Sequence, residues 1–204
     1  FEFLAVGSDT DYQQFSQEVR ATGTIGDVTL TSGLYYWYSD YDTASETYFL
    51  FSWLPTTNLP PGSIGTISQH GENESYAAFS SADWALTEKI TLSAGVRYTY
   101  EEKILEPIGQ QFFLADGTPL QPPVAAVHAN ADWDKWSPRL GAQYRFTDDL
   151  MAYASYSQGF KSGGFFGRIT SGSNVRKFNP EQVDTYEIGV KSTWWDQRLR
   201  ANGA

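Results

Sequence analysis

The chain of 204 residues has a formal net charge of −10, no Cys, and 16% aromatic residues. An acidic chain without clustered Lys and Arg excludes nucleic-acid binding. The lack of Cys excludes a disulfide framework and a thiolate metal site. No run approaches the roughly 18 apolar residues of a membrane helix, which excludes a helical membrane protein.

Taken in chain order, the residues alternate between apolar and polar with period two, which indicates β-strands with one apolar and one polar face. In the segment 90–102, Leu92, Val96 and Tyr98 point to one side, and Ser93 and Arg97 point to the other. The pattern predicts strands at 15–22, 27–39, 74–86, 90–102, 135–147, 150–160 and 183–195.

The predicted connections alternate in length. Short connections lie at 23–28, 86–90, 146–150 and 195–199, and long polar connections lie at about 40–73, 103–132 and 161–179. Long unstructured loops are uncommon in compact domains, whereas short turns at one end and long loops at the other are typical of an outer-membrane β-barrel. Trp residues near the strand ends fit interfacial aromatic girdles. The alternative is a soluble β-sandwich, such as a carbohydrate-binding domain, whose aromatic residues fill the core.

Three segments together carry a resemblance to a known family. They are SPRLG (137–141), YASYSQGFKSGGF (153–165) and FNPEQVDTYEIGVKS (178–192), preceded by the hairpin at 75–103. From about residue 15 onward the chain closely resembles the barrel of TonB-dependent outer-membrane receptors. The resemblance implies a 22-stranded barrel filled by an N-terminal plug, in the outer membrane of a Gram-negative bacterium.

The resemblance also implies a function and partners. Such receptors take up a ferric siderophore or a similar metal chelate with energy supplied by TonB, and their barrels contact outer-membrane lipid and lipopolysaccharide. We expect residues 1–204 to be an all-β, antiparallel, open piece of about seven or eight strands, without plug, TonB box, signal peptide or closing strand. The alternative is a passive porin or an adhesive outer-membrane barrel without TonB coupling.

Enzymatic motifs are not found, and we expect no cofactor, no metal and no catalytic residue. The stretch GFKSGGF at 159–165 is not a Walker A loop, because Phe160 separates Gly159 from Lys161. We interpret its glycines as the point where a strand leaves the membrane and enters an outer loop. The only histidines, His70 and His128, lie in predicted loops, where they are interpreted as solvated rather than as haem ligands.

Two groups of residues are candidates for ligand contact. Polar strand faces carry a first group, for which the resemblance implies a position facing the lumen, toward the plug or the ligand; the alternative is pairing with each other and with water. The first group is Arg97, Arg139, Arg145, Glu187 and Lys191. The third long loop carries a second group, whose cations suit an anionic chelate; its aromatic residues would stack on the ligand or, as the alternative, pack the loops together. The second group is Arg168, Arg176, Lys177, Phe165 and Phe166.

Overall fold

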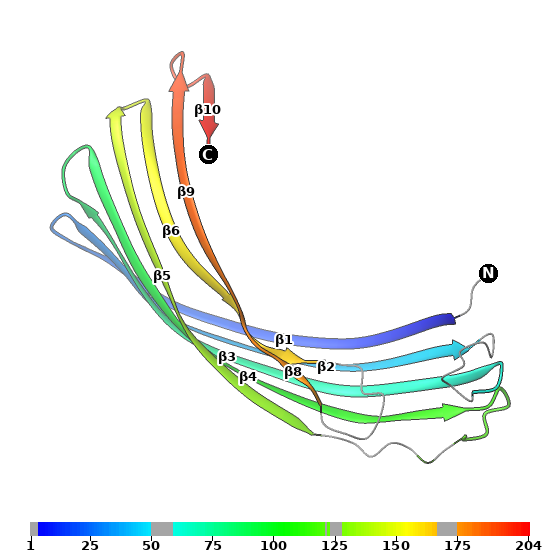
Figure 1. The fold of residues 1–204 in the computed structure, drawn as a ribbon. Coiled ribbons are helices and arrows are strands. Elements are labelled where there is room, and N and C mark those ends of the chain that lie inside the picture. The colour runs from blue at the N-terminus through cyan, green and yellow to red at the C-terminus, as the bar shows by residue number, and fades with distance from the viewer. Residues whose placement is uncertain (1–3, 50–58, 121, 123–127, 167–174) are drawn as a thin grey trace.

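The structure, a computed structural model, describes residues 4–49, 59–120, 122, 128–166 and 175–204. These residues form one open, curved, eight-stranded antiparallel sheet with the order β1-β2-β3-β4-β5-β6-β9-β10, and a small second sheet of β7 and β8 (Figure 1). The all-β antiparallel fold and the number of strands predicted from the sequence are confirmed. No helix in the described ranges has the length and apolarity to cross a membrane.

Neighbouring strands in the chain are neighbours in the sheet, except that β6 pairs with β9 after the small hairpin. The strands of the large sheet are β1 (Leu4–Ile25), β2 (Val28–Phe49), β3 (Ser63–Ala85), β4 (Ile90–Phe113), β5 (Ala129–Thr147), β6 (Leu150–Lys161), β9 (Glu181–Trp194) and β10 (Leu199–Gly203). The hairpin consists of β7 (Gly164–Phe165) and β8 (Lys177–Phe178).

The predicted short turns all lie at one end of the sheet, and the longer connections lie at the other (Figure 1). Two of the turns use a Thr hydroxyl to accept a backbone N–H. Thr87 Oγ1 accepts from Ile90 N at 3.0 Å, and Thr147 Oγ1 accepts from Asp149 N at 3.3 Å. The turn before β10 instead places Trp195 and Asp196 at φ 54° and 53°, in the left-handed region that closes a tight turn.

The predicted long connections are partly wrong, because the strands extend much further than the apolar alternation does. β2 continues to Phe49 and β3 begins at Ser63, so most of the predicted connection at 40–73 is strand. The extended β4 and β5 shorten the predicted connection at 103–132 in the same way. The predicted strand at 15–22 is part of the 22-residue β1. Beyond the membrane both faces of a strand meet water, so hydrophobic alternation ends while the backbone ladder continues. These strands exceed the about 9–11 residues that a spanning strand needs.

The large sheet has no conventional hydrophobic core. Among the described residues the only buried apolar side chains are Ala77 and Leu105, while Leu140 is 54% exposed and Ile188 78% exposed. A soluble β-sandwich would bury such residues against a second sheet. The sandwich interpretation is therefore wrong, and the apolar residues form an outer surface of the kind that faces lipid.

Candidate ligand-binding face

The two faces of the sheet differ sharply in charge. The register pairs Arg97 with Phe79 on β3 and with Ser137 on β5, which defines the polar face; Tyr98, paired with Ala78 and Trp136, defines the apolar face. Every Lys and Arg on the described strands of the large sheet lies on the polar face by register: Arg20, Arg97, Lys103, Lys135, Arg139, Arg145, Lys161, Lys191 and Arg200. The sequence predicted a polar-face position for four of these cations, Arg97, Arg139, Arg145 and Lys191, and not for the other five.

The apolar face carries carboxylates near the long-connection end instead. Glu74, Glu102 and Asp132 lie directly opposite one another on β3, β4 and β5. Tyr36 and Tyr76 both donate to Glu74 Oε1, at 2.8 and 2.7 Å. The tyrosines therefore form a girdle between the apolar band and this acidic row, at the level where a barrel leaves the bilayer.

Arg97 is held in place on the polar face by two aromatic rings. Its Cζ lies 5.1 Å from the ring centroid of Tyr35 and 5.8 Å from that of Phe79, and its Nε donates to Thr99 Oγ1 at 3.1 Å. Phe79 lies directly opposite Arg97 on β3, and the small Ala77 lies between Thr99 and Tyr35, so the guanidinium reaches Tyr35 on β2 diagonally, past Ala77. Cation–π contacts favour this fixed position.

An open pocket of about 530 Å³ lies beside this arginine, and five strands contribute to it. Its lining comprises Tyr35, Trp37, Ser75, Arg97, Thr99, Glu101, Ser137, Gln158, Gly159 and Phe160. Ser75 and Thr99 are buried at its floor. Aromatic rings, a cation and a carboxylate thus surround one concave site, which is the composition of a small-molecule site.

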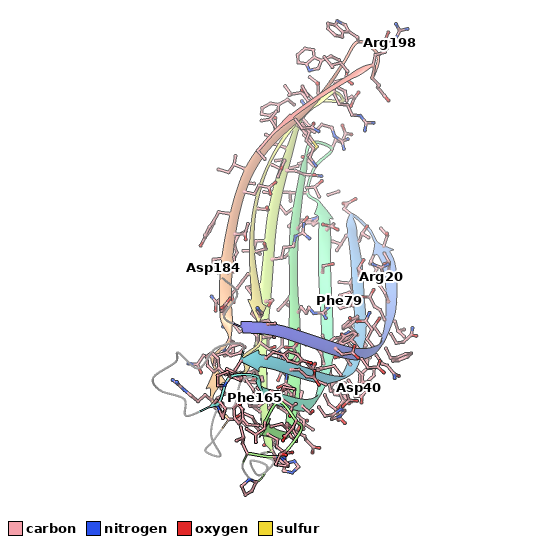
Figure 2. All side chains as sticks on the ribbon, turned by 90° about the vertical axis from the view of Figure 1, so that its right-hand side faces the viewer. Arg20, Asp40, Phe79, Phe165, Asp184 and Arg198 are labelled. Atoms are coloured by element: carbon pink, nitrogen blue, oxygen red, sulfur yellow. The ribbon has the colours of Figure 1, made fainter. Side chains whose placement is uncertain are left out.

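The connection after β6 folds back toward this face. The ring centroids of Phe165 on β7 and Trp133 on β5 are 6.3 Å apart. Lys103 Nζ, on the neighbouring strand β4, lies 5.8 Å from the centroid of the same Trp133 ring. Gly163 packs so closely that an added Cβ would lie 2.5 Å from Trp133 Cε2. The stretch GFKSGGF therefore leaves the sheet as predicted, and its glycines also permit close packing. Figure 2 shows Phe165 among the long connections, at the opposite end of the sheet from Arg198.

The predicted loop group does not form one basic cluster in the described residues. Arg168 lies outside those residues. Arg176 has its Cζ 5.9 Å from the ring of Phe166, and Phe166 packs on Phe178 at 5.6 Å. Lys177 is exposed on β8. Of this group, Phe165 alone contacts the large sheet in the interactions described above.

The predicted strand group all lies on the polar face, but at different heights. Arg97 lines the pocket described above, whereas Arg145 and Lys191 line a second open pocket of about 500 Å³ near the short turns. Glu187 accepts a hydrogen bond from the Tyr153 hydroxyl, over whose ring Lys191 Nζ lies at 5.1 Å. On β5, Arg139 lies between Ser137, which lines the first pocket, and Arg145, which lines the second, and it lines neither pocket itself.

Both histidines pair with carboxylates rather than standing alone in loops. His70, which lies on β3, places Nδ1 3.0 Å from Asp42 Oδ1 and Nε2 3.3 Å from Glu72 Oε1, while His128 Nδ1 lies 3.1 Å from Glu106 Oε1. The Glu72 hydrogen bond, followed by Asp42, raises the pKa of His70 although burial opposes it. The carboxylates occupy opposite ring nitrogens and cannot converge on one ion, and no group of three metal ligands is found within the described residues.

Comparison with known proteins identifies the fold. Residues 3–204 match the family model described as TonB dependent receptor-like, beta-barrel. The chain belongs to this family. Its members are outer-membrane proteins of Gram-negative bacteria, and the predicted family and location are confirmed.

Relatives at the sequence and structure levels agree with this assignment. The pesticin receptor of Yersinia enterocolitica is 26% identical over 201 residues, covering 97% of this chain and 27% of that protein. The ferric-pyoverdine receptor PbuA of Pseudomonas sp. M114 is 29% identical over 126 residues, covering 62% of this chain and 14% of that protein. The crystal structure of the ferric yersiniabactin uptake receptor FyuA from Yersinia pestis matches 95% of this chain and 28% of that chain, with a TM-score of 0.74 and 24% identity. The chain thus spans about a quarter of the length of the curated pesticin receptor it matches.

Proposed function

We propose that the protein containing this chain imports a ferric siderophore or a similar metal chelate across the outer membrane, with energy supplied through TonB. The observation that carries the proposal is the family match over residues 3–204. The relatives support it, because they include a ferric-pyoverdine receptor and a ferric yersiniabactin uptake receptor. Transport of this kind needs binding and gated passage and no covalent chemistry.

The two faces of the sheet fit two sets of partners. The polar face, with Arg97 and its pocket, would face the lumen, where the ligand passes and where a plug would couple to TonB. The apolar face would contact lipid, with its tyrosine girdle near the lipopolysaccharide layer. Charged side chains on the lumen face cost little because that face is wet, whereas lipid would penalise them.

An uptake experiment tests the function. Cells that depend on this receptor for iron would be supplied with ⁵⁵Fe-loaded siderophores of hydroxamate, catecholate and phenolate type, with and without a functional tonB gene. We expect one type to be taken up only when both the receptor and TonB are present. Uptake that persists without TonB would support the passive porin instead, and no uptake of any chelate would support the adhesive barrel.

A further inference from the structure

The polar-face pocket carries opposite charges at two positions of one strand. Arg97, Thr99 and Glu101 are every second residue of β4 and therefore lie on the same face, and all three line the pocket. Arg97 and Glu101 are four residue steps apart along the strand, which places their Cα atoms about 13 Å apart. Thr99, between them, is 7% exposed and forms part of the floor.

The arginine end is prepared for an anion. The guanidinium is fixed by the rings of Tyr35 and Phe79 and by the hydrogen bond from Nε to Thr99. No carboxylate of the described residues lies within 4.0 Å of it. An Arg side chain has five N–H donors in a planar fork that matches a carboxylate, so most of its donors remain available to a ligand.

The glutamate end is prepared for a donor. Glu101 Oε2 is buried and has no hydrogen-bond partner in the described part of the chain. Lys103, the next residue on this face, has its Nζ over the ring of Trp133 and forms no ion pair with Glu101 within 4.0 Å. A buried carboxylate oxygen without a partner is unfavourable. Because Glu101 lines the pocket, rotation of its carboxylate toward a bound N–H donor would form a hydrogen bond there and relieve this burial.

We propose that Arg97 and Glu101 select a zwitterionic chelate, one that carries a free carboxylate and a free ammonium group, as amino-acid and peptide chelates do. The carboxylate binds the guanidinium of Arg97, and the ammonium donates to Glu101. The rings of Tyr35 and Trp37, which lie on the polar face of β2, supply the apolar contact beside the two ends. This proposal rests on the proposed function, because it names the class of chelate that the receptor imports.

A matched set of chelates tests the selectivity on the purified full-length receptor. The probes are four chelates that share one ferric trihydroxamate core and differ only in their terminal group. The terminal group is an α-amino acid, a succinate, a free amine or an acetamide. Binding is measured by quenching of tryptophan fluorescence. We expect the amino-acid chelate to bind about 10- to 100-fold more tightly than the acetamide chelate, as charge-assisted hydrogen bonds allow. Equal binding of the four chelates, or no binding of the amino-acid chelate, overturns the proposal.

Single substitutions assign each end separately. In Arg97→Gln the amino-acid chelate should bind no better than the amine chelate, and in Glu101→Gln no better than the succinate chelate. Arg139→Gln and Glu102→Gln are matched controls, because Arg139 lies on the same face outside the pocket and Glu102 lies on the opposite face. If both pocket variants keep the selectivity of the parent, these residues hold the plug rather than the chelate, and the proposal is wrong.

The outcome is distinguishable from failure of the proposed function. TonB-dependent ⁵⁵Fe uptake without any zwitterion preference would overturn the selectivity and leave the transport function standing. Zwitterion-selective binding without TonB-dependent uptake would overturn active transport and leave the selectivity of the pocket standing.

Discussion

Glu101 and Glu102 are adjacent and chemically identical, yet they occupy opposite environments. Glu101 lines the polar-face pocket and has a buried oxygen without a partner, whereas Glu102 lies on the apolar face between Glu74 and Asp132. Like charges directly opposite one another destabilise a sheet, so the Glu102 row is tolerated where water and counter-ions reach it. The comparison shows that side-chain direction, rather than residue type, decides what a residue on this sheet can do.

The largest expected effect comes from placing a charged side chain on the apolar face of β5. Leu140→Arg would place a cation in the apolar band and should reduce the free energy of unfolding by about 2–4 kcal/mol, because lipid does not solvate it. Arg139→Leu, one residue away on the polar face, should change it much less. Urea unfolding of the full-length receptor in lipid vesicles, followed by gel mobility, measures both. Equal effects of the two substitutions would contradict the assignment of the faces.

Gly33→Ala should give the next largest effect. A Cβ at this position would lie 2.5 Å from Phe79 Cζ and 2.7 Å from Val19 O, so the ring that supports Arg97 must move. Overpacking of this kind costs about 1–3 kcal/mol. Gly23→Ala, on neighbouring β1, has open space and is the control. The same unfolding measurement, together with the affinity for the amino-acid chelate, should show both losses in Gly33→Ala alone.

Gly163→Ala should act locally on the contact between the hairpin connection and Trp133. A Cβ at position 163 would overlap the Trp133 ring and the Phe178 backbone. We expect amide exchange in β7 and β8 to accelerate about tenfold, which corresponds to about 1.4 kcal/mol of local stability. Gly159→Ala, in open space on β6, is the control. Unchanged exchange in Gly163→Ala would show that the packing is not tight in solution.

The smallest expected effect is the pH dependence of His70. Its pKa is raised above the ordinary value of 6.5 by its hydrogen bonds to Glu72 and Asp42. The stabilisation is therefore fully present below about pH 6.5 and is lost as the pH rises through the folded-state pKa. Because the pairs are partly exposed, it amounts to about 0.2–1 kcal/mol. Amide protection at the ends of β2 and β3 should fall between pH 6 and pH 8, and His70→Gln should abolish the difference.

The sequence predicted the parts of the fold that local pattern controls. Alternation identified the spanning part of seven strands of the large sheet. The short turns were located correctly because local features close them, such as the Thr147 hydroxyl. The long strand extensions were missed. Residues such as Asp42 and His70 lie in a regular ladder where both faces are polar, and hydropathy carries no signal there.

The candidate site was predicted only in part, for a related reason. Arg97 was singled out because it lies on a polar strand face, whereas Glu101 was not among the candidate residues. The pocket that they share is lined by residues from Tyr35 on β2 to Phe160 on β6, four strands away in the sheet. One carboxylate oxygen of Glu101 is buried there without a hydrogen-bond partner. The spacing of residues in the sequence shows neither which residues of different strands meet nor whether a carboxylate oxygen is buried.

The amino-acid sequence by itself determined the period-two alternation, the short turns and hence an amphipathic antiparallel sheet, because these depend on neighbours along the chain. Only the tertiary structure decided which residues meet. The cross-strand register placed the strand cations on one face, laid Arg97 over Tyr35 and set Glu101 beside the same pocket, and the return of the chain after β6 placed Phe165 on Trp133. Register is a long-range property, since a shift of one residue would send every side chain to the opposite face.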